Sequence, residues 1–176
     1  MRNAVLLFLL VATAVPAASA GPPAAGDPCP AFTLRSGRRG VLQSSSLRGR
    51  VLVITYETRE VTKKNSAFKN RVLEYYFSVP DRSSLMAPLP VINCHKYIGP
   101  VKTICTQSVL KESASHSIPI YDDRDGKMFR DFCMQDDESN VIIIDRQGII
   151  LYRRAGLLSR QDIDAAMVLI QTLVGR

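Results

Sequence analysis

The stretch Val141-Ile142-Ile143-Ile144-Asp145-Arg146-Gln147-Gly148-Ile149-Ile150-Leu151-Tyr152-Arg153 carries the strongest structural signal in the chain. Its first four residues are β-branched and apolar, which predicts a strand buried on both faces. Residues 146–148 have the composition of a tight turn, so residues 149–153 are expected to form the antiparallel partner. The stretch therefore predicts a hairpin within a covered sheet.

A helix is expected directly after this hairpin. Ser159 precedes the helix, and Asp162 stands three residues later, as in a capping box. Gly175 ends the pattern. The apolar stripe of this helix consists of Ile163, Ala166, Met167, Ile170 and Leu173.

Earlier segments alternate between strand and helix patterns. Residues 51–56 (VLVITY) predict a central strand, and turn signals predict a hairpin over 31–43. Further segments are expected as a strand at 89–93, a short segment at 119–122, and helices at 63–76, 101–115 and 127–134. In the 101–115 helix, the side chains expected to face the core are Val101, Ile104, Cys105, Val109 and Leu110.

This order of elements predicts the fold class. Strands that alternate with helices, followed by a hairpin and a final helix, indicate an α/β fold with a mixed central sheet and helices on both faces. The chain of 176 residues suits one domain, and its charged fraction of 22% is ordinary for a globular protein.

The N-terminus has the pattern of a signal peptide. Arg2 is followed by the apolar run 4–15, by Pro16 and by Ala18-Ser19-Ala20. We expect residues 1–20 to be cleaved near Ala20-Gly21, which would place the protein in the periplasm or outside the cell. Residues 21–28 (GPPAAGDP) are expected to be a linker, and residues 29–176 the folded domain. No later segment is long and apolar enough to predict a transmembrane helix.

The chain is basic, with a formal net charge of +7, which cleavage of the Arg2 segment would lower by one. Outside the cytosol such a charge favours anionic membrane surfaces and cell-wall polymers over nucleic acid. The basic residues are scattered among acids, and no phosphate-binding glycine loop or nucleophile motif is present. No cofactor is therefore predicted.

Four cysteines stand in the exported part: Cys29, Cys94, Cys105 and Cys133. An even number in an exported protein predicts disulfides, but four cysteines allow three full pairings. Cys94 and Cys105 could form a static disulfide, a displaced redox pair or two buried thiols. With His95 and His116 they could also ligate zinc or copper, although no metal-binding spacing is present and no metal is predicted.

Several segments resemble known exported proteins. Residues 30–34 (PAFTL) and 47–53 (LRGRVLV) resemble the opening of thioredoxin-like and peroxiredoxin-like proteins, and residues 144–150 resemble their closing strand-turn-strand. Residues 137–175 resemble the YtfJ family, which are exported bacterial proteins of thioredoxin-like fold. The resemblance implies a thioredoxin-like three-layer sandwich.

The usual redox motif of that fold is missing here. Thioredoxin-like oxidoreductases carry C-x-x-C just after the strand that corresponds to 51–56, with a thiolate at a helix N-terminus. Glu60 and Lys63 stand roughly in those two positions, and neither residue exchanges electrons. Ser139-Asn140 replaces the cis-Pro loop, and a trans bond is expected there.

The resemblance places a binding cleft at this end of the domain. Its candidate residues are Thr58, Arg59, Glu60, Lys63, Ser139 and Asn140. The acidic loop 136–138 should lie beside residues 57–63, where the two charged sides could recognise a partner or pair with each other. The leading hypothesis is a binding or accessory protein, without usual catalytic residues, for an unknown protein or peptide. The alternative is a thiol-disulfide or peroxide-linked protein that uses Cys94 and Cys105.

Overall fold

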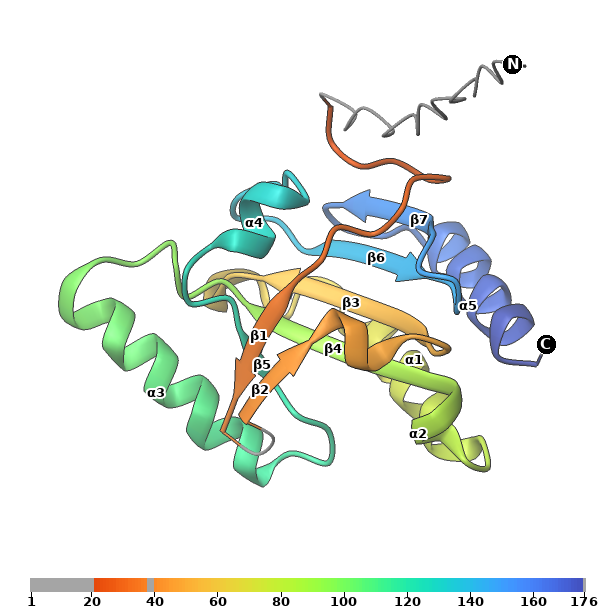
Figure 1. The fold of residues 1–176 in the computed structure, drawn as a ribbon, viewed down its shortest axis with the longest axis horizontal. Helices are drawn as coiled ribbons and strands as arrows, with labels where there is room; N and C mark the ends of the chain where they lie inside the picture. The colour runs from red at the N-terminus through yellow and green to blue at the C-terminus, as the bar shows by residue number, and fades with distance from the viewer. Residues whose placement is uncertain (1–20, 38–39, 176) are drawn as a thin grey trace, which may run out of the picture.

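The computed structural model describes residues 21–37 and 40–175, and within them the strands form a single mixed sheet (Figure 1). Its seven strands lie in the order β2-β1-β5-β4-β3-β6-β7. β3 pairs in parallel with β4 and β4 with β5, whereas all other neighbours are antiparallel. The strands are β1 (Thr33–Ser36), β2 (Gly40–Gln43), β3 (Val51–Glu57), β4 (Met86–Ile92), β5 (Tyr121–Asp122), β6 (Asn140–Ile144) and β7 (Ile150–Ala155).

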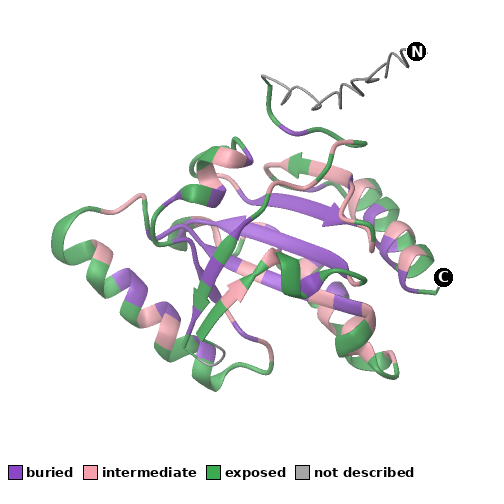
Figure 2. Ribbon diagram, in the orientation of Figure 1, coloured by how far each residue is buried: buried purple, intermediate pink, exposed green. Residues whose placement is uncertain are grey.

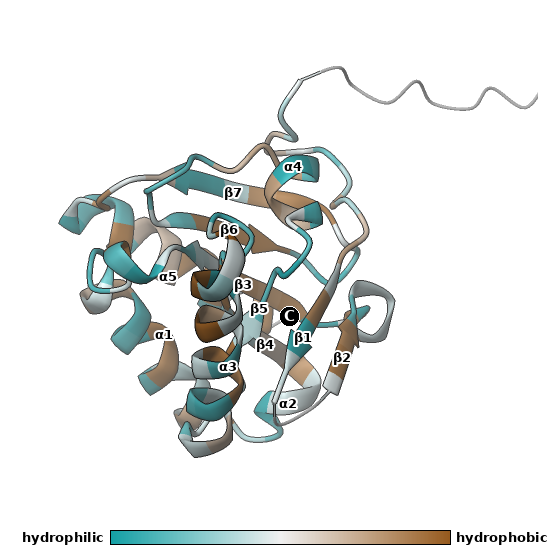
Figure 3. Ribbon diagram, turned by 90° about the vertical axis from the view of Figure 1, so that its left-hand side faces the viewer, coloured by the Kyte–Doolittle hydropathy of each residue, from teal (hydrophilic) through white to brown (hydrophobic). Residues whose placement is uncertain are grey.

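Helices cover both faces of the sheet, as the order of elements predicted. Figure 3 shows α1, α3 and α5 on one side, and α4 together with the β1–β2 hairpin on the other. The helices are α1 (Ser66–Ser78), α2 (Arg82–Leu85), α3 (Gly99–Ser115), α4 (Lys127–Asp131) and α5 (Arg160–Val174), with short 3-10 turns η1 (Ser44–Leu47) and η2 (Arg59–Val61). The α5 capping box is present, because Ser159 and Asp162 bond each other's backbone N–H.

The core lies on both sides of β3 and β6, whose residues are all buried (Figure 2). Alternate residues of β3 enter different clusters, since successive side chains point to opposite faces. Val51 and Val53 pack with Phe68 of α1 and Ile170 of α5. On the other face, residues such as Leu52 and Ile54 pack with α4 and the hairpin.

The strand predicted at 89–93 begins earlier, at Met86, and contains Pro88 and Pro90. Asn93 donates its N–H to Glu57 of β3, so the odd-numbered N–H groups of this strand face β3. The N–H groups that the two prolines lack would therefore face the opposite edge, where β5 pairs only with Val91 and Ile92. Proline is tolerated on such an unpaired edge, which is why the strand accommodates two of them.

Two further predictions about the helices were wrong in detail. Val101 and Ile104 are 54% and 59% exposed rather than buried. The N-terminal turns of α3 project beyond the sheet (Figure 1), so only later residues such as Cys105 and Val109 reach the core. The first helix begins at Ser66 rather than at Lys63, because a 3-10 turn and further turns occupy residues 59–65.

The predicted linker 21–28 is not separate from the sheet in the structure. Gly26 and Asp27 exchange backbone hydrogen bonds with Ile150, and Arg153 donates to the carbonyl of Pro23. The predicted signal peptide, residues 1–20, lies outside the described residues. Within the part of the chain that the structure describes, no helix is long and apolar enough to cross a membrane.

Candidate functional site

An ion pair lies at the end of β3, beside the segment where the fold usually carries its thiols. Glu57 is 4% exposed. Its two carboxylate oxygens accept hydrogen bonds from Lys69 Nζ of α1 at 3.0 and 2.8 Å. The same ammonium donates to the carbonyl of Thr62, and Ser139 Oγ donates to Glu57 Oε1 at 2.6 Å. The charges are thus paired and hydrogen-bonded, as burial requires.

The loop that replaces the cis-Pro loop is held by buried amides. Asn65 donates to Ser139 Oγ and to the carbonyl of Gly156, both at 2.9 Å, and accepts from the N–H of Leu158. The side chain of Asn140 donates to backbone carbonyls and accepts from the N–H of Gln135. No cis peptide bond occurs in residues 21–37 and 40–175. Ser139 and Asn140 therefore support this loop from within the core.

The acidic loop and its basic neighbours pair with each other across the cleft. Lys64 contacts Glu138 at 2.6 Å, and Lys96 pairs with Asp137. The pairing with Lys96 lowers the pKa of the Asp137 carboxyl. The sequence allowed the two charged sides either to recognise a partner or to pair with each other. In the structure they pair with each other.

A second set of contacts joins the turn after β3 to the α3 side. Tyr97 donates its hydroxyl to both carboxylate oxygens of Glu60 at 2.7 Å, and Arg59 lies 3.7 Å from Glu112. Burial and this hydrogen bond raise the pKa of Tyr97 to about 12. The same hydrogen bond is the main cause that lowers the pKa of Glu60. The side chains in these contacts are largely exposed, so each contact contributes little to stability.

The six cleft candidates occupy different environments. Thr58 is buried and contacts Asp137, whereas Arg59, Glu60 and Lys63 are exposed. Ser139 and Asn140 are buried. The principal cavity of this region is not lined by any of these six residues. It is bounded instead by their neighbours Glu57, Thr62 and Lys69.

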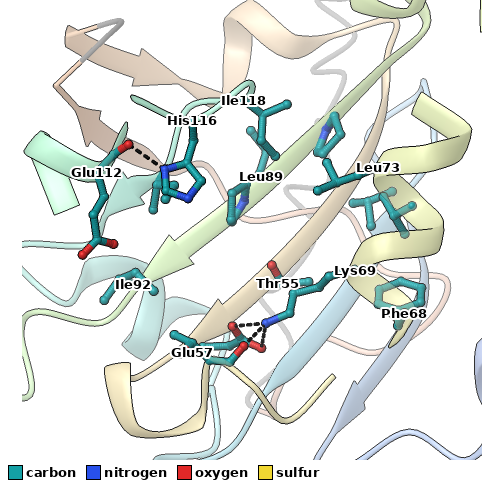
Figure 4. A pocket seen from close by; sticks show the side chains of 16 residues that line it. Thr55, Glu57, Phe68, Lys69, Leu73, Leu89, Ile92, Glu112, His116 and Ile118 are labelled. Atoms are coloured by element: carbon teal, nitrogen blue, oxygen red, sulfur yellow. Dashed lines mark hydrogen bonds and ion pairs between the residues drawn. The ribbon is translucent and has the colours of Figure 1, made fainter. Parts of the chain in front are cut away.

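That cavity lies between α1 and α3 on the sheet face formed by β3 and β4 (Figure 4). Its volume is about 350 Å³. Phe68, Lys69, Val72 and Leu73 come from α1, Glu112 from α3, and His116, Ile118 and Ile120 from the segment that follows α3. The floor is formed by Val53, Thr55, Glu57, Pro88, Leu89, Pro90 and Ile92.

The cavity is apolar along most of its length and polar at two ends. Glu57 and Lys69 form one polar end, and the other holds His116, whose Nδ1 lies 2.7 Å from the carbonyl of Glu112 (Figure 4). Sequence reasoning missed this cavity. Pro88, Leu89 and Pro90 lie on its floor, but no sequence pattern indicates a gap between two helices.

The cysteines divide into one pair and two free thiols. Cys94 and Cys105 form a disulfide whose half-cystines are 0% and 2% exposed. Cys29 and Cys133, which were also disulfide candidates, are free. Burial raises the pKa of Cys29 to about 12, whereas Cys133 is exposed. Because Cys94 and Cys105 are joined, their thiolates are not available to a metal, and no cluster of three metal-binding side chains occurs among the described residues.

Two neighbouring carboxyl groups, Asp122 and Asp123, are buried. Asp122 accepts a hydrogen bond from Thr106, the neighbour of Cys105, at 2.9 Å, but its Oδ1 has no partner among the described residues. Asp123 accepts from Tyr56 and from the N–H groups of Met128 and Phe129. Burial is the largest cause that raises the pKa of both carboxyls.

Solved structures of similar fold confirm the architecture. A protein from Chlorobium tepidum described as a thiol:disulfide interchange protein DsbE is 20% identical, with 87% of this chain and 99% of that chain covered and a TM-score of 0.65. A protein from Bacteroides thetaiotaomicron described as a protein disulfide isomerase is 15% identical (88% and 92% covered, TM-score 0.65). The exposed lipoprotein thioredoxin Etrx1 from Streptococcus pneumoniae is 14% identical (82% and 100% covered, TM-score 0.56).

These likenesses show a thioredoxin-like fold, and at such identities they show the fold alone. A search among curated proteins found no match. A family model described as "Bacterial protein of unknown function (YtfJ_HI0045)" matches residues 41–173, which is most of the chain. The chain therefore belongs to the YtfJ family of thioredoxin-like proteins.

Proposed function

We propose that this chain is an exported binding protein that holds an apolar group of a peptide or protein partner in the cavity between α1 and α3. The observation that carries the proposal is the cavity itself. It is concave, about 350 Å³ in volume and mostly apolar, with a few polar groups at its ends. Ligand sites in proteins have this composition and begin at about this size.

The ion pair at the end of β3 supports binding rather than thioredoxin-type electron transfer. Glu57, Lys69 and Ser139 satisfy one another's hydrogen bonds, and no cysteine stands between Cys29 and Cys94. The charged cleft above the pair is closed by its own ion pairs. An apolar side chain that enters the cavity needs no charged partner, so it can bind without breaking these contacts.

A neutral fluorescent probe tests the cavity directly. The probe 1-N-phenylnaphthylamine carries no charge and gains fluorescence in apolar surroundings. Leu73→Trp places a larger side chain in the cavity, and we expect it to weaken probe binding at least tenfold. Val168→Trp is the matched control, because Val168 is 62% exposed on α5 and does not line the cavity. No binding by the natural chain, or equal binding by the Leu73→Trp protein with its fold retained, would refute the proposal.

Export has a separate test. Expression of the whole chain in a bacterial host, followed by fractionation and intact-mass measurement, should yield a periplasmic protein that begins at Gly21. Retention of residues 1–20 in a cytoplasmic protein would contradict the export part of the proposal and leave the cavity unaffected.

Thiol-disulfide exchange through Cys94 and Cys105 is the second candidate function. It is favoured by the fact that these two cysteines are joined, in a fold whose solved neighbours include proteins described as thiol-disulfide oxidoreductases. Their burial opposes it, because exchange requires an accessible sulfur. An insulin-reduction assay on the natural chain and on Cys94→Ser decides: turnover that disappears in the variant supports exchange, and no turnover leaves binding as the function.

A further inference from the structure

A second pocket lies toward the other end of β3 and on the opposite face of the sheet from the cavity between α1 and α3, since Leu52 lines this pocket and Val53 lines the cavity. It has a volume of about 250 Å³ and is formed where η1 and the loop 48–50 meet the β6–β7 turn. Val51 and Glu57 are the two ends of β3, so roughly 20 Å of extended chain separate the pocket from the Glu57 ion pair. Any ligand here is therefore distinct from the one proposed above.

Three arginines line this pocket: Arg48, Arg50 and Arg146, here called the arginine pocket. Asp145 is the only acidic residue among its lining residues. Oδ1 of Asp145 already accepts the N–H groups of Gln147 and Ile149, at 2.9 and 2.8 Å.

The three guanidinium groups are not neutralised by the protein. None of them makes an ion pair with any residue in the described ranges 21–37 and 40–175. Within the described residues, Arg50 donates only to the carbonyl of Ser46, and Arg146 only to the carbonyl of Val174. The Nε of Arg146 is buried and has no hydrogen-bond partner among the described residues. A buried donor without a partner is costly, so an acceptor from outside the described residues would be favourable here.

We propose that the arginine pocket binds a phosphate dianion, either free or as the monoester headgroup of a lipid. Three arginines and one aspartate leave two positive charges, which a dianion balances. Guanidinium groups bind phosphate oxygens with paired, charge-assisted hydrogen bonds. Ser44 and Ser45 add hydroxyl donors at the same pocket. The loop is held in place for this role, because Gly49 donates its N–H to the carbonyl of Arg146.

Calorimetric titration of the natural chain with inorganic phosphate, at constant ionic strength, is the first arm of the test. Arg48→Gln and Arg50→Gln should each weaken binding at least tenfold. Arg146 is left unchanged, since it also bonds the last turn of α5. Arg160→Gln is the matched control, because Arg160 is exposed on α5 and does not line the pocket. Circular dichroism confirms that each variant is folded.

Vesicle sedimentation is the second arm and separates the two sources of phosphate. Phosphatidylcholine vesicles that contain phosphatidic acid present a phosphate monoester, whereas those that contain phosphatidylglycerol present a diester, at a content adjusted to give the same surface charge. Binding of free phosphate alone identifies a soluble ligand, and selective binding of phosphatidic acid vesicles identifies a lipid headgroup. The proposal is overturned if neither binds, if Arg160→Gln loses as much affinity as Arg48→Gln, or if both vesicle types bind equally and free phosphate does not bind.

Discussion

Replacement of Lys69 by methionine should destabilise the protein far more than loss of an ordinary surface charge. Lys69 donates two of the three hydrogen bonds that the Glu57 carboxylate accepts from the described residues, at 3.0 and 2.8 Å, so its loss leaves only the one from Ser139. Glu57 is 4% exposed, so its carboxyl group would stay buried without its ammonium partner. Loss of one partner of a buried pair costs about 3–5 kcal/mol.

The lower end of that range applies here, because the side chain of Lys69 is itself 21% exposed. We therefore expect the Lys69→Met variant to lose about 3 kcal/mol of unfolding free energy in urea titrations, with an unchanged m value. At about 2–4 °C per kcal/mol for a domain of this size, the midpoint of thermal unfolding should fall by roughly 6–12 °C.

Two further variants make the reasoning specific. The double variant Glu57→Gln, Lys69→Met removes both charges and should recover about 2 kcal/mol of that loss, and the single variant Glu57→Gln completes the double-mutant cycle that gives the coupling energy of the pair. Lys127→Met removes one partner of an exposed pair with Asp131 and should cost about 0–1 kcal/mol. A Lys69→Met loss no greater than that of Lys127→Met would refute the argument, because it would mean that Glu57 does not depend on Lys69.

Three other outcomes follow from the cysteines and a buried acid. The disulfide between Cys94 and Cys105 closes a loop with a sequence separation of 11. The double variant in which both cysteines are replaced by serine should therefore lose about 3 kcal/mol of unfolding free energy in urea titrations. Iodoacetamide at mildly alkaline pH should modify exposed Cys133 well before Cys29, whose thiol pKa is raised to about 12; peptide mass spectrometry reads the order. Burial also raises the pKa of Asp122 above its unfolded value, so its carboxyl favours the folded state at low pH and that contribution is lost as the pH rises through the folded pKa. Asp122→Asn should therefore gain unfolding free energy relative to the natural chain as the pH rises above about 4, the ordinary pKa of an aspartate, and a pH-independent difference would contradict this.

The parts of the fold that were predictable are those in which a local pattern and the tertiary packing agree. Residues 141–144 form a buried strand wherever they are placed in a covered sheet, and Ser159 with Asp162 caps a helix through contacts within one turn. The β4 strand was placed too late, because Pro88 and Pro90 are tolerated only on an edge that the topology leaves unpaired. That edge is a property of the assembled sheet and not of the segment.

The candidate site was harder to predict for the same reason. The chain position of the cleft was inferred from the family resemblance, and the acidic loop does lie against Lys64 and Lys96. The cavity, however, depends on the space that α1 and α3 leave over β3 and β4, which no periodicity encodes. α3 itself carries Val101 and Ile104 at helical spacing, and only the position of its first turns beyond the sheet leaves them exposed.

Satisfied and unsatisfied polar groups are distributed unevenly over this fold, and the distribution bears on function. At the end of β3 where thioredoxin-like enzymes do their chemistry, Glu57, Lys69, Ser139 and Asn65 bond one another. Reactive groups are normally left available to a substrate, so this arrangement supports the proposal that a partner binds by shape in the apolar cavity. At the opposite end, Arg146 has a buried donor with no partner in the part of the chain that the structure describes, and Arg48 and Arg50 make no ion pair there. Polar recognition is therefore expected at the arginine pocket, and the two ends of β3 can serve different ligands.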